Sequence, residues 1–216
     1  MASSEDQMSA ILFDLGGVLV ELTGVPILLS WVGNRMTPED LWSMWLSSPV
    51  VRSFETGRLD PAVFANELIK EMALPVSAEE FLREFTSWPR GLFPGALQLV
   101  RRIPRKYVRA TLCNTNAVHW PRLMSEMRLA DAFDHHFASH LIGRIKPDED
   151  AFQYVIETLG RSASEILFLD DNKLNVEAAK RAGMKAAQVR GAEEAEAVLS
   201  ELRIIRRENI GEGKEP

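Results

Sequence analysis

One stretch near the start of the chain, Ala10-Ile11-Leu12-Phe13-Asp14-Leu15-Gly16-Gly17-Val18-Leu19-Val20, decides its fold. Ile11 to Phe13 is a short apolar run between turn-forming residues, which is typical of a buried parallel strand. Asp14 stands where this strand ends, and Gly16 and Gly17 permit a tight turn toward a ligand. Ligands of open α/β sheets bind at the carboxyl ends of the strands, so Asp14 is a candidate nucleophile or metal ligand. A turn or helix-capping aspartate is the alternative.

The composition of the 216 residues is that of an ordinary globular protein, with 46% hydrophobic and 26% charged residues. A formal charge of −6 and the absence of a basic run argue against nucleic acid as a partner. A phosphorylated substrate stays allowed, because a bound cation and a few local basic side chains reverse the sign of the charge inside a pocket. Cys113 is the only cysteine, so no intrachain disulfide is expected and a reducing compartment is favoured.

The start of the chain and its apolar runs bear on its location. Residues 1–9 are polar and acidic without a basic segment, so they do not resemble a signal peptide. No apolar run approaches the roughly 20 residues that a membrane helix needs. We therefore expect a cytoplasmic protein that does not contact a membrane.

The segment after the first strand differs from the rest, because it carries four of the five tryptophans. It is predicted to form short amphipathic helices: Asp60-Pro61 is typical of a helix start, and Ser77 with Glu80 is typical of a capping box. The tryptophans are expected to pack among these helices, with stacking on a sugar ring as the alternative. No part of the segment is typical of a strand, so residues 23–91 are interpreted as an all-helical insertion.

Strand and helix patterns alternate from Pro94 onward. Strands are predicted over 107–112, 133–139, 166–169 and 185–189, and helices over 94–102, 120–129, 146–160 and 193–202, with a further helix that closes at Gly183. This alternation predicts a doubly wound, mostly parallel, Rossmann-like α/β sheet, with residues 1–22 and 92–205 as a discontinuous core. The polar tail, 206–216, is expected to be disordered.

Four groups of polar residues stand at strand ends or helix starts: Asp14, Cys113-Asn114, Lys146 and Asp170-Asp171. Since the carboxyl ends of parallel strands lie along one edge of a sheet, these groups are expected to meet. Three carboxylates and a lysine form a candidate site for Mg²⁺ and phosphate, because Mg²⁺ prefers oxygen ligands. The alternatives are a lysine at a helix start, and N-capping of the next helix by one of the two aspartates.

With these motifs in this order, nearly the whole chain resembles a haloacid dehalogenase-like hydrolase with a helical cap after the first strand. The nucleophile motif of that family is similar to Phe13-Asp14-Leu15-Gly16-Gly17-Val18, and its later motifs are similar to Leu112-Cys113-Asn114, Gly143-Arg144-Ile145-Lys146-Pro147 and Leu169-Asp170-Asp171 with Asn175. The pieces Glu55-Thr56-Gly57 and Glu71-Met72-Ala73-Leu74-Pro75 resemble the bacterial branch that includes α-glucose-1-phosphate phosphatase.

The resemblance implies that Asp14 attacks phosphorus and forms an aspartyl-phosphate, which water then hydrolyses. It implies Mg²⁺ bound by Asp14, the carbonyl of Gly16 and Asp171, with Asp170 and Asn175 behind these ligands. The family's usual general acid is an aspartate two positions after the nucleophile, where this chain has Gly16. Since general acid catalysis contributes about 10²–10⁴-fold, a substrate whose leaving group departs easily, such as a sugar 1-phosphate, is favoured.

The resemblance also implies phosphate binding by Lys146, Asn114 and the residue before Asn114. That residue is usually a serine or threonine, and here it is Cys113, whose thiol is a weaker donor, so Thr115 is the other candidate. A cysteine phosphatase needs an arginine six residues later, and His119 stands there. Cys113 is therefore expected to be a small residue packed at a strand end.

The sequence thus predicts a Mg²⁺-dependent phosphoric monoester hydrolase of a small phosphorylated metabolite, with a sugar phosphate such as a hexose 1-phosphate as substrate. One alternative is a metal-independent 2-haloacid dehalogenase, in which Asp170 and Asp171 have no metal to bind. Another is a non-catalytic homologue that binds a phosphorylated ligand or a protein. A monomer or homodimer is expected, and His135, His136 and His140 are expected to be strand and surface residues rather than zinc ligands.

Overall fold

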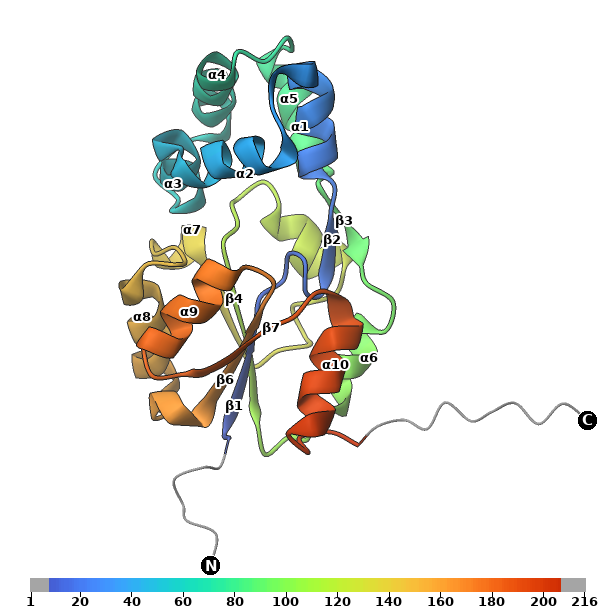
Figure 1. Ribbon diagram of the computed structural model, residues 1–216, viewed down its shortest axis with the longest axis vertical. Helices are drawn as coiled ribbons and strands as arrows, with labels where there is room; N and C mark the ends of the chain where they lie inside the picture. The colour runs from blue at the N-terminus through green and yellow to red at the C-terminus, as the bar shows by residue number, and fades with distance from the viewer. Residues whose placement is uncertain (1–7, 207–216) are drawn as a thin grey trace, which may run out of the picture.

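The computed structural model describes residues 8–206, in which five parallel strands form the central sheet (Figure 1). Their order across the sheet is β5 (His135–Ala138), β4 (Val108–Cys113), β1 (Ala10–Phe13), β6 (Ile166–Asp170) and β7 (Lys185–Gln188). This arrangement confirms the predicted doubly wound α/β class. The predicted disordered tail lies, beyond Arg206, outside the described residues.

Helices cover both faces of the sheet, with α6 (Ala96–Arg102) and α10 (Gly191–Glu201) on one side and α8 (Glu149–Leu159) and α9 (Lys173–Arg181) on the other (Figure 1). The alternation of side chains along β1 divides the core between the two faces. Ile11 and Phe13 belong to the apolar cluster with α6 and α10, whereas Ala10 and Leu12 belong to the cluster with α8 and α9. β1 is therefore buried on both faces, which explains its continuous apolar run.

Residues between the first strand and the rest of the sheet form a separate group of helices, here called the helical cap. It consists of α1 (Gly24–Val32), the 3-10 helix η2 (Gly33–Arg35), α2 (Pro38–Ser47), α3 (Pro49–Glu55), α4 (Pro61–Met72) and α5 (Ala78–Thr86). Its own apolar cluster includes the stacked rings of Phe54 and Phe64, whose centroids are 4.0 Å apart. Asp60 and Ser77 cap α4 and α5 as the sequence predicted, but the reciprocal bond from the Ser77 N–H to the Glu80 side chain, which would complete the capping box, is not formed. Each cap oxygen accepts a backbone N–H bond.

Two short antiparallel strands, here called the connecting ribbon, join the helical cap to the sheet (Figure 1). They are β2 (Val20–Leu22) and β3 (Pro89–Leu92). The prediction that residues 23–91 are all helical is therefore wrong at 89–91. The sequence Pro89-Arg90-Gly91-Leu92 contains a proline and a glycine, which are rare in strands. It forms a strand because it pairs with β2, although its own residues do not favour one. The division into a core, 1–22 with 92–205, and a cap, 23–91, stays a prediction.

Two further elements differ from the sequence prediction. The helix expected over 120–129 is a short π-helix, η3 (Arg122–Glu126), which local propensity does not distinguish from an ordinary helix. The helix expected from Lys146 begins at Glu149, after the N-cap residue Asp148, so Lys146 lies in the preceding loop. The remaining short helices are α7 (Ser139–Ile142) and η4 (Ala163–Glu165). Among residues 8–206, no helix has the length and apolar character to cross a membrane.

Candidate active site

The carboxyl ends of the three central strands place the predicted polar residues side by side. Asp14 directly follows β1, Asp170 is the last residue of β6, and Asn114 directly follows β4. Because β1 pairs with β4 on one side and with β6 on the other, Asp14 lies between the two. The same edge of the sheet faces the helical cap (Figure 1).

Lys146 reaches this edge from the loop before α8 and binds two of the carboxylates. Its Nζ lies 2.8 Å from Asp14 Oδ1 and 2.6 Å from Asp170 Oδ2, and the residue is only 4% exposed. Burial disfavours the ammonium ion, but the two carboxylates outweigh this and raise the pKa of Lys146 above its usual range. The side chain is therefore a fixed positive charge beside Asp14.

Asp170 is fully buried and held from three directions. Besides Lys146, it accepts hydrogen bonds at 3.1 Å from the side-chain amide of Asn175 and at 2.8 Å from the backbone N–H of Asn172. The N-cap of α9 is Asn172, whose side chain accepts from the Leu174 N–H, so the expectation that one of the two aspartates caps this helix is wrong. Asp170 instead orients Lys146, and Asn175 orients Asp170.

A third carboxylate, Asp171, completes a cluster that fits a divalent cation. One oxygen each from Asp14, Asp170 and Asp171 lie within 4.8 Å of one another. Burial raises the pKa of Asp14 to about 7, opposed by Lys146 and assisted by the two other aspartates. Burial and Asp170 likewise raise the pKa of Asp171. The three carboxylates can carry more negative charge than the Lys146 ammonium group neutralises. A hard cation, which prefers oxygen ligands, would balance the remainder.

The glycines after Asp14 leave room for this cluster. Gly17 has φ +75°, and a Cβ atom at this position would lie 2.3 Å from Asp171 Oδ2. A Cβ atom on Gly16 would lie 2.7 Å from the tip of Leu22, which is 53% exposed. Gly17 therefore permits Asp171 to approach the backbone after β1, while Leu22 covers the space in which a side chain at position 16 would begin.

The residues that follow β4 organise the neighbouring loop. Asn114 donates from Nδ2 to the carbonyl of Lys146 and accepts at Oδ1 from the N–H of Lys146, both at 2.9 Å. Thr115 exchanges two 2.9 Å hydrogen bonds with the buried hydroxyl of Ser139. Asn114 therefore holds the main chain of the lysine loop, a role that the sequence did not predict.

Cys113 is buried at the end of β4, with its Sγ 4.0 Å from the carbonyl of Phe137. Burial, assisted by the charge of Asp14, raises the pKa of the Cys113 thiol well above its usual range. A thiolate nucleophile needs the opposite shift. The packing confirms the prediction of a small residue at a strand end and disfavours a cysteine phosphatase.

The helical cap contributes a carboxyl group to this edge that the sequence did not single out as a site residue. Glu55 is the last residue of α3, and both Lys146 and Asp14 act electrostatically on its side chain. Burial raises the pKa of Glu55 to about 7, opposed by a hydrogen bond from Trp45 and by Lys146. The only sequence signal was that Glu55-Thr56-Gly57 resembles a motif of one family branch.

His119 links the same cap to the core. Its Nε2 lies 2.7 Å from the carbonyl of Phe85, and its Nδ1 lies 3.2 Å from the amide nitrogen of Asn116. The Asn116 carbonyl oxygen accepts the N–H of His119 itself, which fixes the amide so that its NH₂ group faces Nδ1. The imidazole is therefore neutral and donates from Nε2, and burial lowers the pKa of His119 to about 4.

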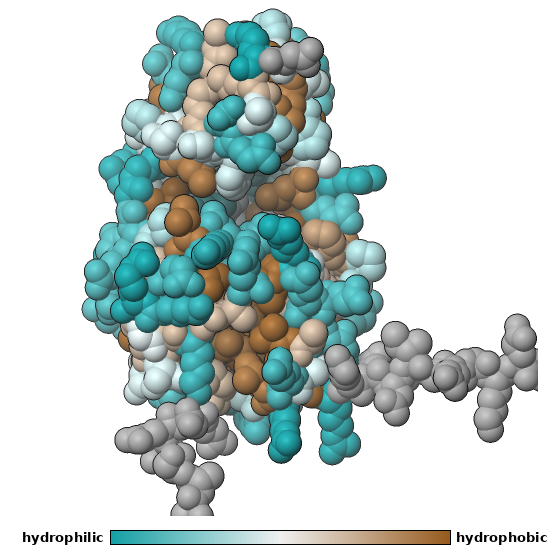
Figure 2. Space-filling view, in the orientation of Figure 1, coloured by the Kyte–Doolittle hydropathy of each residue, from teal (hydrophilic) through white to brown (hydrophobic). Residues whose placement is uncertain are grey.

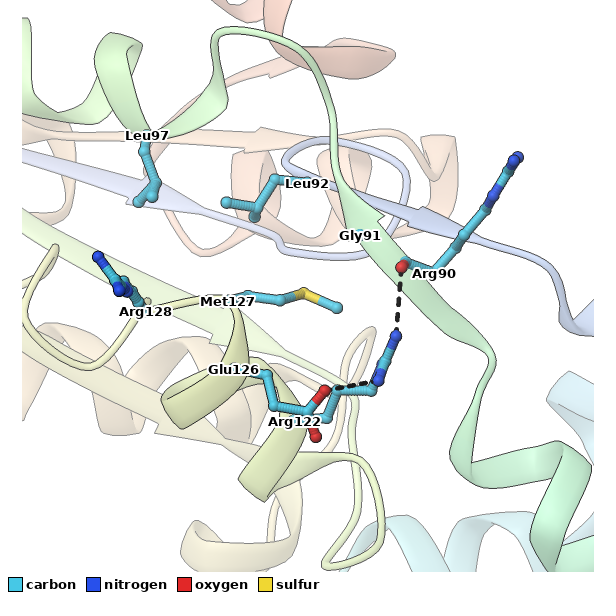
Figure 3. A pocket seen from close by; sticks show the side chains of 8 residues that line it. All are labelled: Arg90, Gly91, Leu92, Leu97, Arg122, Glu126, Met127 and Arg128. Atoms are coloured by element: carbon cyan, nitrogen blue, oxygen red, sulfur yellow. Dashed lines mark hydrogen bonds and ion pairs between the residues drawn. The ribbon is translucent and has the colours of Figure 1, made fainter.

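A pocket of about 420 Å³ opens beside the connecting ribbon, away from the carboxylates (Figure 3). Arg122 crosses it, donating at 2.7 Å to the carbonyl of Pro89 and at 3.3 Å to that of Arg90, and it pairs with Glu126 at 2.6 Å. The guanidinium thus fastens β3 to η3. Its hydrogen bonds and ion pair engage the guanidinium fully, so Arg122 has a structural role in holding the ribbon.

The other features that the sequence singled out lie outside the carboxylate cluster. In the described part of the chain, the candidate metal ligands that gather in one place are the three aspartates, and no histidine joins them. Trp45 and Trp88 pack in the core of the helical cap as predicted, whereas Trp42 is 43% exposed. The alternative of a sugar-stacking role is thus open for Trp42 alone among these three.

Comparison with known proteins agrees with this geometry. The family model of the haloacid dehalogenase-like hydrolases matches residues 8–183. The sesquiterpene phosphatase astK of Aspergillus oryzae is 32% identical over 178 residues, covering 81% of this chain and 86% of that protein. The D-ribitol-5-phosphate phosphatase of Bacteroides thetaiotaomicron is 24% identical over 82% of this chain and 90% of its own length.

A crystal structure shows the same fold. It is a family enzyme from Bacteroides thetaiotaomicron in complex with magnesium and inorganic phosphate, with 23% identity and a TM-score of 0.67 over 84% of this chain and 93% of that one. The family match spans both the nucleophile motif and the acidic motif after β6, and the relatives compared are phosphatases. The chain therefore belongs to the haloacid dehalogenase-like hydrolases and is an enzyme of their phosphatase group.

Proposed function

We propose that the protein is a Mg²⁺-dependent phosphatase that cleaves a small phosphate monoester through an aspartyl-phosphate on Asp14. One observation carries the proposal: Lys146 binds Asp14 and Asp170 together, while Asp171 completes a three-carboxylate cluster at the same strand ends. A nucleophilic carboxylate beside a fixed ammonium group and a cation site is suited to attack an anionic phosphoryl group. Free carboxylates alone would repel that group.

The cation site would consist of Asp14, Asp171 and the main-chain carbonyl of Gly16. Mg²⁺ bound there supplies charge neutralisation for the phosphoryl oxygens and for the attacking carboxylate. Asp170 would orient Lys146 and, with Asn175, support the ligands from behind. The magnesium and phosphate complex of the Bacteroides enzyme supports the choice of this cation for the shared fold.

Binding of the phosphoryl group would fall to Lys146, assisted by the loop after β4. Both polar atoms of the Asn114 side chain contact the main chain of Lys146, so Asn114 would act mainly by holding that loop. The Thr115 N–H donates to Ser139, so other backbone N–H groups next to it would complete the phosphate cradle, since oriented backbone donors favour an anion. Cys113 would contribute packing rather than a strong hydrogen bond.

A sugar phosphate is the first substrate class that we propose. Within it a sugar 1-phosphate is favoured, because its anomeric oxygen departs easily and position 16 has no side chain to protonate a poorer leaving group. A second class, phosphates of apolar alcohols, is favoured by the half-exposed Leu22 that lies against Gly16. Hydrophobic residues also gather beside the hollowed waist between cap and core (Figure 2). The name of the Aspergillus relative, a sesquiterpene phosphatase, supports this second class.

The test is release of inorganic phosphate from a panel of sugar phosphates and sesquiterpene alcohol phosphates, with Mg²⁺ and again with EDTA. We expect release that depends on the metal and disappears in Asp14→Asn, because an amide does not attack phosphorus. Turnover that survives in Asp14→Asn overturns the proposal. Chloride release from chloroacetate without metal would instead assign the protein as a dehalogenase, and silence in both assays would favour a binding protein.

A further inference from the structure

The proposed phosphatase reaction needs a proton that the core does not supply. When the bond between phosphorus and the ester oxygen breaks, an alkyl leaving group departs as a strongly basic oxygen anion unless an acid protonates it. Gly16 has no side chain, and Leu22 covers the space beside it. Lys146 is committed to Asp14 and Asp170, which keep its ammonium form. The inference that follows rests on the proposed function.

The helical cap contacts the core next to these strand ends, at the C-terminal end of α3. Helix α3 packs against α7 of the core. Gly57 has φ +74°, and a Cβ atom there would lie 2.4 Å from the carbonyl oxygen of His140. On the same helix, Arg52 forms an ion pair with Asp148, two residues after Lys146. The turn after Glu55 therefore packs directly against the core.

The Glu55 carboxyl group lies close enough to three core residues for their charges to act on one another. Lys146 and Asp14 both act on it electrostatically, and its own charge acts on Cys113 at the end of β4. In the proposed reaction Asp14 attacks the phosphoryl group and Lys146 binds it, so Glu55 lies near the reacting groups. On the cap side, Trp45 interacts with the same carboxyl and favours its charged form. With a pKa raised to about 7 by burial, Glu55 is available in both its acid and its base form near neutral pH.

We propose that Glu55 is a catalytic residue: the cap-borne general acid and base that replaces the side chain missing at position 16. In the first step, Asp14 attacks phosphorus, the ester P–O bond breaks, and the Glu55 carboxyl gives its proton to the departing oxygen, leaving a neutral alcohol and a Glu55 carboxylate. In the second step, the carboxylate takes a proton from water as that water attacks phosphorus. The Asp14–phosphorus bond breaks, and phosphate, the Asp14 carboxylate and protonated Glu55 result.

The test compares two esters of similar size in Glu55→Gln. p-Nitrophenyl phosphate releases a stabilised anion that needs no proton, whereas benzyl phosphate releases an alkoxide that does. We expect turnover of benzyl phosphate to fall by about 10²–10⁴-fold. We expect p-nitrophenyl phosphate to give a burst of one equivalent of nitrophenolate followed by slow turnover, because the first step needs no acid and the second lacks its base. Glutamine keeps the size of the side chain and removes its acidic proton.

The controls separate this inference from the proposed function. Glu79→Gln makes the same chemical change on an exposed cap residue and should leave both reactions unchanged. In Glu55→Ala, added formate should restore part of the benzyl phosphate rate. An equal fall on both esters without a burst, or no fall, overturns the role of Glu55 while the loss of activity in Asp14→Asn upholds the phosphatase. Activity that survives in Asp14→Asn overturns both.

Discussion

The side-chain amide of Asn114 brackets the main chain of Lys146, donating to its carbonyl and accepting from its N–H at 2.9 Å each. Asn114 lies beside the end of β1 because β4 is the neighbour of β1 in the sheet. The strand order therefore sets where the loop that carries Lys146 is held relative to Asp14. The position of the Lys146 ammonium group relative to Asp14 therefore depends on a residue 32 positions earlier in the chain.

Asn114→Ala should lower kcat/KM more than it lowers stability. Loss of the two hydrogen bonds should reduce the free energy of unfolding by about 1–3 kcal/mol. The loosened loop should reduce phosphatase kcat/KM by about 10–100-fold, because small errors in position are costly in catalysis. Urea unfolding and phosphate release measure the two effects. Asn66→Ala, which removes an amide from the surface of α4, is the control. Equal losses of kcat/KM in both variants would show that Asn114 does not position the loop that carries Lys146.

Gly17→Ala should weaken magnesium binding. A Cβ atom at position 17 would meet Asp171 Oδ2 at 2.3 Å, so Asp171 must move away from Asp14. Calorimetric titration with Mg²⁺ should show at least a tenfold loss of affinity, in the range found for disturbed metal-site partners. Gly95→Ala introduces the same backbone strain at φ +79° with no atom within 4 Å of the new Cβ, and it should bind the metal as the wild type does. Unchanged magnesium affinity in Gly17→Ala would show that Asp171 is not a ligand of the metal.

His119 should make the protein less stable in mild acid. Its pKa is lowered to about 4 in the folded protein, against about 6.5 in an unfolded chain. Above pH 6.5 both states are neutral and His119 contributes no pH dependence. As the pH falls toward 4, the unfolded state binds a proton that the folded state refuses, so stability is lost.

The corresponding measurement is urea unfolding at pH 7.5 and pH 5. His119→Gln should reduce the stability difference between these two conditions by about 2 kcal/mol relative to the wild type. The same change at His135, an exposed residue of β5, provides the comparison. An undiminished difference in His119→Gln would show that the imidazole is protonated in the folded state.

Arg122→Ala should loosen the connecting ribbon. The arginine donates to the carbonyls of Pro89 and Arg90, and alanine leaves both without this partner. We expect a loss of about 1–3 kcal/mol in stability and faster hydrogen exchange in β2 and β3. Arg83→Ala on the surface of α5 removes an exposed arginine and should change neither. Unaltered exchange in Arg122→Ala would mean that strand pairing alone holds the ribbon.

Gly16→Asp should restore an acid to the core when Leu22 is also shortened. The new Cβ would lie 2.7 Å from the tip of the Leu22 side chain, so Gly16→Asp with Leu22→Ala relieves the contact. Added to Glu55→Gln, the pair should recover at least tenfold of the lost benzyl phosphate turnover, since general acid catalysis contributes about 10²–10⁴-fold. Leu22→Ala with Glu55→Gln is the control. No recovery would mean that position 16 does not face the leaving oxygen.

The sequence predicts the core of the site well because strand ends of a parallel sheet share one edge. Asp14 and Asp170 follow from this rule, and the structure places both within hydrogen-bonding distance of Lys146, which lies in the loop before α8. The capping of α4 by Asp60 was also predictable, because it depends on adjacent residues.

Features that depend on contacts between distant segments were not predictable in the same way. Strand β3 exists through pairing with β2, and the neutral state of His119 depends on its burial beside Phe85 of the helical cap. Glu55 shows the same limit. Its sequence motif was visible, yet its place near Lys146 depends on how the helical cap is seated on the core.

Leu22 lies on one of the two strands that carry the cap, and its tip rests against Gly16. Because the ribbon joins the cap to the core, a movement of the cap would carry Leu22 with it. A cap that opened to admit a substrate would therefore also expose the backbone turn after Asp14, and its closure would cover that turn again. One movement of the cap would then control both the entry of substrate and the exposure of this turn to water.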